Sequence, residues 1–246
     1  MRSALINALP APIADGLRAL KKRCVRLMYW LTPSQLLTPM QRFQRDGFAS
    51  LLFQGTALTP SSTVLDIGGH VGMFSDSVLA QAPCRLEIFE PMPEYASHLR
   101  RKYWGRPNVT VHPYGLAATD AQRTFYARDD GTGEFVDGNP VEVNFKALDA
   151  VVASLPPTFD LVAINIEGGE YELLPLLVDL GVMPRIRRLV VQFHRLDAKS
   201  AARVEAIRAR LQRTHKCVWS YAFVWECWEL LSPKAPKPCR FPKNMD

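Results

Sequence analysis

Short apolar runs alternate with amphipathic segments through most of the 246-residue chain, and this alternation constrains the fold more than any other feature. Runs rich in β-branched and aromatic residues, typical of strands, cover 63–68, 84–90, 108–114, 159–167 and 187–194. Helical periodicity falls between most of them, over 71–81, 93–104, 170–181 and 198–214. Strands that alternate with helices predict an α/β fold, with a doubly wound, mostly parallel sheet covered on both faces.

The stretch 122–152 departs from this alternation. Residues 129–133, which read DDGTG, indicate a turn between extended segments and not a crossover helix. The run LDAVV at 148–152 is also expected to be extended. We therefore expect an insertion or extra strands near the end of the sheet.

The chain length suits one α/β domain with short terminal additions. We expect an N-terminal helical extension over 1–50, the folded domain over 51–232 and a Pro- and Lys-rich tail over 233–246. The helix predicted within the extension has an apolar stripe opposite its cations, formed by Ile13, Leu17, Leu20, Cys24, Leu27 and Leu31. Residues 13–31 can lie on an anionic membrane, or pack on the domain or on the second subunit of a homodimer.

Charge and cysteine usage narrow the choice of partner and compartment. The net charge is +6, but the basic residues are scattered and cluster only at 21–26 and in the tail, so we expect no nucleic-acid partner. The five cysteines lack ligand-like spacing and are odd in number, which favours reduced thiols. Pro10, Pro12 and Asp15 interrupt the apolar start, which argues against a signal peptide. We expect a cytoplasmic protein that can reach the inner membrane surface through residues 13–31.

The first predicted strand runs into a glycine-rich turn, VLDIGGHVGMF at 64–74, which is where a parallel sheet binds ligands. A dinucleotide fingerprint would require glycine at 70 and 73, where this chain has His70 and Met73. No phosphate-binding P-loop motif occurs in the sequence. Asp66 at the strand end would repel a pyrophosphate and favours a ligand with positive charge, such as the sulfonium of S-adenosylmethionine.

Three later strand ends carry polar residues that suit such a ligand. Glu90 follows the second strand and can accept both hydroxyls of a ribose. Asn165, Glu167 and Glu170 surround a pair of glycines after the fourth strand, although Glu170 also suits the first turn of a helix. His194 lies near the end of the fifth strand and has a side chain suited to proton transfer.

In order and spacing, these motifs resemble the FkbM-type methyltransferases, a branch of the class I S-adenosylmethionine-dependent enzymes. The family pattern D-I-G-A-N-x-G is similar to residues 66–72, F-E-P to 89–91 and K-I-D-V-E-G-A-E to 163–170. The resemblance covers about residues 50 to 195 and implies a seven-stranded class I fold. It also implies methyl transfer from S-adenosylmethionine to an oxygen, a hydroxyl or a carboxylate, of a sugar or natural-product intermediate.

The resemblance also implies roles for individual residues. Glu167 and His194 would face a small-molecule or glycan acceptor, and one of them would act as the general base. The residues that would bind the cofactor are Asp66, Gly68, Gly69, His70, Gly72, Phe74, Glu90, Pro91, Leu116, Ala117 and Asn165. Among these, Glu90 would hold the ribose, and Leu116 and Ala117 would lie near the adenine.

Several residues depart from the family pattern. His70 replaces Asn, Ala163 replaces Lys, Asn165 replaces Asp and Gly169 replaces Ala. Because Asn165 removes a carboxylate that a hard cation would need, we expect no metal. The departures leave open an inactive cofactor-binding or scaffold protein with the same fold. An NAD oxidoreductase is disfavoured by Asp66 and by the missing glycines.

Overall fold

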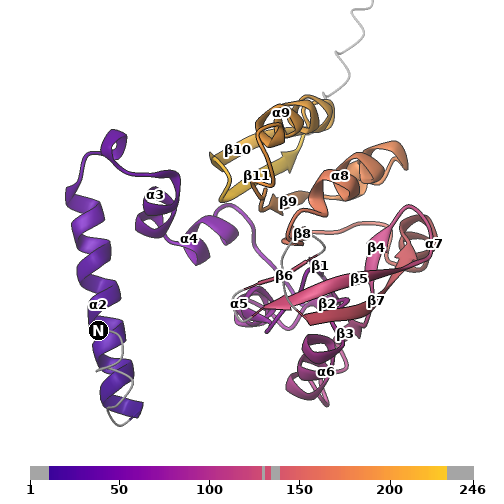
Figure 1. The fold of residues 1–246 in the computed structure, drawn as a ribbon, viewed down its shortest axis with the longest axis horizontal. Coiled ribbons are helices and arrows are strands. Elements are labelled where there is room, and N and C mark those ends of the chain that lie inside the picture. Colours follow the sequence, from indigo (N-terminus) through magenta and orange to yellow (C-terminus); the bar gives the residue numbers. More distant parts are fainter. Residues whose placement is uncertain (1–10, 129–130, 134–138, 232–246) are drawn as a thin grey trace, which may run out of the picture.

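The computed structural model describes residues 11–128, 131–133 and 139–231. Its centre is a seven-stranded sheet in the order β10-β11-β9-β8-β1-β2-β3 (Figure 1). Neighbouring strands are parallel except β11, which runs opposite to β9 and β10. The strands are β1 (Thr63–Ile67), β2 (Arg85–Phe89), β3 (Val109–His112), β8 (Leu161–Ile164), β9 (Arg188–Val191), β10 (His215–Tyr221) and β11 (Trp225–Leu230). The predicted doubly wound, mostly parallel α/β sheet is confirmed.

Helices between the strands cover both faces of this sheet. They are α5 (Met73–Leu79), α6 (Pro93–Lys102), α8 (Glu170–Asp179) and α9 (Ser200–Leu211), close to the ranges predicted from periodicity. Every residue of β1 is buried, since neither face of the strand meets water. Val64 points into one hydrophobic cluster with Ile88, whereas Leu65 points into the other with Phe89. Because successive side chains of a strand point to opposite faces, β1 contributes to two hydrophobic clusters, one on each face of the sheet.

The stretch after β3 forms a second sheet instead of extending the first. Its strands are β4 (Gly115–Ala117), β5 (Ala121–Arg128), β6 (Gly131–Gly133) and β7 (Asn139–Ala147), in the order β4-β7-β5-β6. The predicted extended segments are thus confirmed, but they pair with one another and with β4. The turn predicted over 129–133 is wrong at 131–133, which form β6 and pair with β5. Arg123 of β5 ties this sheet to α8 through two hydrogen bonds to the Glu172 carboxylate, of 2.9 and 3.1 Å.

The extended conformation predicted for residues 148–152 is wrong, because they belong to the helix α7 (Leu148–Ser154). Leu148, Val151 and Val152 are buried against the main hydrophobic cluster. A spacing of three and four residues puts these side chains on one face of a helix. The run is too short for its period to separate a helix from a strand, so tertiary packing decides.

From residue 11 onward the N-terminal extension is helical, as predicted. It contains α2 (Ala11–Leu31), the 3₁₀ turn η1 (Ser34–Leu36), α3 (Pro39–Asp46) and α4 (Phe48–Phe53). Figure 1 shows α2 standing apart from the sheet, with α3 and α4 between them. In the part of the chain that the structure describes, no helix is both long and apolar enough to cross a membrane. The predicted tail at 233–246 lies outside the described residues, and the domain boundaries stay predictions.

Candidate functional site

The strand order reverses at β1, since β2 and β3 follow on one side of it and β8 and β9 on the other. In open α/β sheets the crevice at the carboxyl ends of such strands is the usual ligand site. The loops after β1 and β8 meet here at Gly68, whose φ is +97°. A Cβ at this position would lie 1.9 Å from the backbone oxygen of Asn165, so only glycine permits the approach.

The glycine turn is tied to its neighbours by backbone and side-chain contacts. Gly68 and Gly69 both donate their N–H groups to the carbonyl oxygen of Phe89 at the end of β2, at 2.9 and 3.3 Å. Gly72 has a φ of +83° and precedes the first residue of α5. A Cβ on Gly72 would lie 2.5 Å from the Tyr103 hydroxyl, which donates to the Gly72 carbonyl at 3.1 Å. The glycines at 68 and 72 therefore allow neighbouring groups to approach the backbone of this turn more closely than a side chain would permit.

Glu90 lies buried beneath the turn. One carboxylate oxygen accepts the backbone N–H of His70 at 2.8 Å, and the other accepts that of Met92 at 2.9 Å. Burial raises the pKa of Glu90, and these two hydrogen bonds oppose the rise. Each carboxylate oxygen keeps a further lone pair that a ligand hydroxyl can use. Pro91, next along the chain, is half-buried.

His70 has a left-handed backbone with φ of +45°, in the conformation from which its N–H reaches Glu90. Its ring is exposed and packs edge-on against Tyr95 of α6, with ring centroids 4.3 Å apart. A left-handed histidine is uncommon and is held here by its surroundings. His70 thus joins the turn, Glu90 and α6.

Asp66 does not present its carboxyl group to solvent. Its side chain accepts a hydrogen bond of 2.6 Å from Ser75 in α5, and the residue is only 3% exposed. Burial raises the pKa of Asp66 to about 7, against the lowering effect of the Ser75 hydroxyl. A carboxyl group with this pKa is partly neutral near pH 7, so its electrostatic effect on a ligand is smaller than the sequence implied. Its direct structural effect is to hold α5 against β1.

Asn165, just beyond β8, leaves its side-chain oxygen buried and without a hydrogen-bond partner within the described residues. Buried polar atoms in folded proteins are nearly always paired, with protein, water or a ligand. The oxygen is therefore suited to accept a hydrogen bond from a ligand bound where β1 and β8 end.

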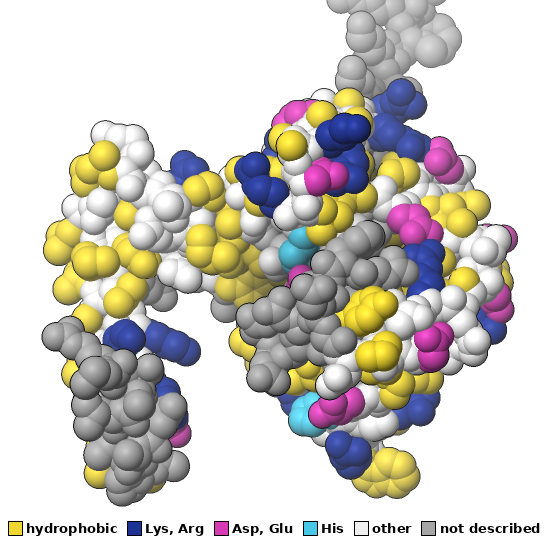
Figure 2. Space-filling view, in the orientation of Figure 1, with side chains coloured by type: hydrophobic (Ala, Val, Ile, Leu, Met, Phe, Trp, Pro, Cys, Tyr) yellow, Lys and Arg dark blue, Asp and Glu magenta, His cyan; other side chains and the backbone are white. Residues whose placement is uncertain are grey.

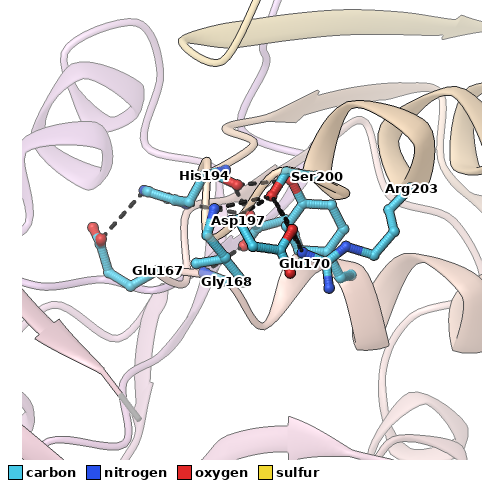
Figure 3. Close-up of polar contacts among 9 residues, drawn as sticks. Glu167, Gly168, Glu170, His194, Asp197, Ser200 and Arg203 are labelled. Atoms are coloured by element: carbon cyan, nitrogen blue, oxygen red, sulfur yellow. Dashed lines mark hydrogen bonds and ion pairs between the residues drawn. The ribbon is translucent and has the colours of Figure 1, made fainter. Parts of the chain in front are cut away.

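His194, in the loop after β9, lies between two carboxylates (Figure 3). Its Nε2 is 3.3 Å from Oε2 of Glu167, and its Nδ1 is 3.3 Å from Oε1 of Glu170. The Glu170 carboxylate also accepts the backbone N–H of His194 at 2.7 Å and that of Gly168 at 2.8 Å. Glu167 is exposed, whereas Glu170 is fully buried. Glu170 therefore holds the imidazole on its buried side, and Glu167 contacts the ring nitrogen on the solvent side.

The position of Glu170 gives it a role that sequence reasoning missed. From the sequence, Glu170 is explained by the dipole of the helix that it begins. In the structure it links the ends of β8 and β9 through His194 and Gly168. The position of Glu170 at a strand end beside two glycines indicated that it could belong to the site. Its partner His194 lies 24 residues away, so a local sequence pattern could not identify this contact.

The loop that carries His194 is anchored on its other side by polar contacts. Ser200 accepts the backbone N–H groups of Leu196 and Asp197, each at 3.0 Å. Arg203 donates to the Asp197 carboxylate at 2.9 Å, and Tyr171 donates its hydroxyl to the His194 carbonyl at 2.7 Å. This network, drawn in Figure 3, holds the backbone of the loop in place.

The two neighbouring carboxylates set the protonation of His194. Burial disfavours the imidazolium, but the hydrogen bonds and negative charges of Glu167 and Glu170 outweigh it and raise the pKa of His194 to about 9. In turn, the hydrogen bond with His194 lowers the pKa of Glu167, with burial opposing the change. At neutral pH the pair is therefore an imidazolium beside a carboxylate.

We expect Glu170→Gln to lower the pKa of His194 from about 9 toward its ordinary value of 6.5, because one of its two carboxylate partners is lost. Titration of the histidine ring signals by NMR measures the midpoint in each protein. Glu172→Gln is the matched control, since Glu172 occupies the same helical turn but pairs with Arg123. An unchanged midpoint in Glu170→Gln would contradict the assignment.

The side chains of three further residues that were predicted to bind the cofactor lie in or against hydrophobic clusters. Leu116 is buried in the main cluster beside Ile67, and Ala117 is buried in a smaller cluster with Phe145. Phe74 is partly buried and packs against the cluster that contains Val64. Any contact of Leu116 and Ala117 with an adenine would have to come from their backbone. No group of three or more His, Cys, Asp or Glu side chains able to hold a metal occurs among the described residues.

Comparison with known proteins finds similarity to methyltransferases and to part of a biosynthetic enzyme. No family model matches the sequence. The AMB antimetabolite synthetase AmbE of Pseudomonas aeruginosa is 25% identical over an alignment of 206 positions, which covers 65% of this chain and 10% of AmbE. This chain therefore spans about a tenth of the length of the curated relative that it matches.

Solved structures of several methyltransferases are similar to this chain. A putative O-methyltransferase from Klebsiella pneumoniae is 13% identical with a TM-score of 0.44, covering 86% of this chain and 89% of that one. The precorrin-6y C5,15-methyltransferase of Geobacter metallireducens is 16% identical with a TM-score of 0.42, covering 75% and 87%. An rRNA methylase from Streptococcus thermophilus is 12% identical with a TM-score of 0.45, covering 72% and 90%.

Proposed function

We propose that the protein is an S-adenosylmethionine-dependent methyltransferase that transfers the methyl group to an oxygen acceptor. The observation that carries the proposal is the presence of two features at one edge of the sheet, where β1, β2, β8 and β9 end. Glu90 lies under the glycine turn on one side, and Glu167 pairs with His194 on the other. The motifs that resemble FkbM-type enzymes occupy this same edge of the sheet.

The residues present suit S-adenosylmethionine. Gly68, Gly69 and Gly72 keep the backbone of the turn free of side chains, and a Cβ on each would come within 2.5 Å of another atom. Glu90 retains lone pairs for the ribose hydroxyls. Asn165 offers a buried oxygen without a partner. When bound, the cofactor supplies an electrophilic methyl group on a sulfonium centre.

The protein's own contribution is to place the acceptor and to take its proton. An acceptor oxygen must be held about 3 Å from the methyl carbon, in line with the departing sulfur. A hydroxyl acceptor also loses its proton, for which a positioned base gives about 10²–10⁴ in rate. We assign this base to the neutral form of His194, which would take the proton at Nε2, the ring nitrogen beside the exposed Glu167; the Glu167 carboxylate would then stabilise the imidazolium. Glu170 is a positioning residue, because it fixes both the ring and the backbone of His194.

We propose a small-molecule or glycan acceptor, a sugar or a natural-product intermediate, and no metal. The similarity to part of an antimetabolite synthetase supports an acceptor from small-molecule biosynthesis. The replacement of a carboxylate by the Asn165 amide supports a reaction that needs no hard cation.

We expect S-adenosylhomocysteine to bind the protein in a one-to-one complex, measured by titration calorimetry. Glu90→Gln should weaken binding at least about tenfold, because hydrogen bonds to a charged group contribute about 1.5–3 kcal/mol. Glu94→Gln, at an exposed position of α6, is the control and should leave binding unchanged.

The same calorimetry with NADH, and an assay of labelled methyl transfer, separate the candidate functions. No binding by the folded protein would refute the proposal. Binding of NADH in place of S-adenosylhomocysteine would indicate the oxidoreductase. Binding without transfer of a labelled methyl group to any glycan, lipid-linked or natural-product acceptor would indicate the inactive scaffold.

A further inference from the structure

The helix α2 carries an apolar stripe that the described part of the protein leaves exposed. Four side chains of the stripe are each more than half exposed, namely Ile13 (54%), Leu20 (57%), Leu27 (59%) and Leu31 (68%), and Met28 beside them is 55% exposed. Their spacing places them on one side of a helix with about 3.6 residues per turn. Figure 2 shows hydrophobic side chains along the side of α2 that faces away from the body of the molecule.

The protein contacts α2 through a different side of the helix. Val25 and Tyr29, four residues apart, are partly buried near the end of α2 that packs against α3. Neither residue belongs to the stripe, since each lies more than a quarter turn from Leu20 and Leu27. The extension is thus packed in a way that leaves the apolar stripe open to a partner.

The charge on α2 is strongly positive. Residues 11–31 include five basic residues and a single acidic one, Asp15, which pairs with Arg18 at 2.8 Å. Lys21 and Arg23 flank the apolar stripe, one on each side, and both are exposed. A surface that fits α2 is therefore apolar at its centre and negatively charged beside it.

Two other occupants fit this surface less well. A second copy of α2 would bring its own Lys21 and Arg23 beside those of the first helix, and like charges along such a seam destabilise pairing. A nucleic acid would match the cations but would not bury the apolar stripe, because its outer surface is phosphate. An anionic phospholipid bilayer satisfies both features, with acyl chains for the stripe and negative headgroups for the flanking cations.

We propose that α2 is a membrane-docking helix that lies in the surface of an anionic phospholipid bilayer and holds the sheet domain beside it. Ile13, Leu20, Leu27 and Leu31 would enter the boundary between headgroups and acyl chains. Lys21 and Arg23 would remain at headgroup level, where their long side chains reach the phosphates. The proposal is independent of the methyltransferase assignment, because it uses no residue of the candidate site.

Sedimentation of the 246-residue chain with lipid vesicles tests this proposal. We expect binding to vesicles that contain phosphatidylglycerol and at least tenfold weaker binding to vesicles of phosphatidylcholine alone. The double variant Leu20→Glu, Leu27→Glu should lose at least tenfold in binding to the anionic vesicles. Lys21→Glu combined with Arg23→Glu should remove the preference for anionic lipid and leave only weak binding.

Leu180→Glu is the matched control, since Leu180 is a leucine exposed by 44% at the end of α8, away from α2. It should bind vesicles as the wild-type protein does. Equal sedimentation of wild-type protein and the Leu20→Glu, Leu27→Glu variant would overturn the proposal. So would a wild-type dimer in light scattering that this variant converts to a monomer without any vesicle binding, since the occupant would then be a second copy.

Discussion

Replacing His194 with alanine should lower turnover about a hundredfold or more, measured with an acceptor identified by labelled methyl transfer. The reason is that a positioned base contributes about 10²–10⁴ to such a reaction. Binding of S-adenosylhomocysteine should persist in this variant, because His194 contacts Glu167 and Glu170 and not the residues assigned to the cofactor. His98→Ala removes an exposed histidine of α6 and should leave turnover unchanged.

The pH dependence of turnover gives an independent check on the same residue. A base must be neutral to accept a proton, and the pKa of His194 is raised to about 9 by its carboxylate partners, against burial. Below that value the neutral fraction, and with it turnover, should rise about tenfold per pH unit and level off near pH 9. A profile that is flat between pH 7 and 9 would remove His194 as the base and would fit a carboxylate acceptor.

Gly68→Ala should destabilise the fold by about 3 kcal/mol or more and abolish binding of S-adenosylhomocysteine. The backbone at Gly68 has a φ of +97°, which costs about 1–3 kcal/mol for other residues. In addition, the new Cβ would lie 1.9 Å from the Asn165 carbonyl oxygen, so the loops after β1 and β8 would have to separate. Urea denaturation measures the free energy of unfolding, and calorimetry measures the binding.

Gly105→Ala separates the two contributions to this effect. Gly105 has a φ of +75°, but a Cβ there would meet no atom within 4 Å. Gly105→Ala should therefore lower the free energy of unfolding only by the cost of the left-handed backbone, about 1–2 kcal/mol. If Gly68→Ala destabilises the protein no more than Gly105→Ala does, the contact between the two loops is not as tight as the structure indicates.

Much of the sheet was predictable because the signals are local. A strand buried on both faces, such as β1, appears as a continuous apolar run, and the amphipathic helices appear by their period of 3.6 residues. Residues 148–152 were the exception, since five residues hold little more than one helical turn. Leu148, Val151 and Val152 form the buried face of a helix because they pack into the main hydrophobic cluster.

The candidate site was predictable in its place but not in its contacts. The strand ends bearing Asp66, Glu90, Glu167 and His194 were identifiable, because parallel strands must end at one edge. The sequence did not indicate which of these side chains contact each other. Asp66 turns to Ser75, and Glu170, not named as catalytic from its sequence position, is the residue that fixes His194.

The sequence by itself determined the α/β class, the parallel sheet, the glycine turn and the amphipathic character of α2, since each depends on residues close together in the chain. Only the tertiary structure decided the second sheet, the helix α7, the partners of Asp66 and the protonation of His194. The physical reason is distance. Hydrogen bonds and charge effects act over a few ångströms between groups such as His194 and Glu170, 24 residues apart, so they exist only once the strands are assembled.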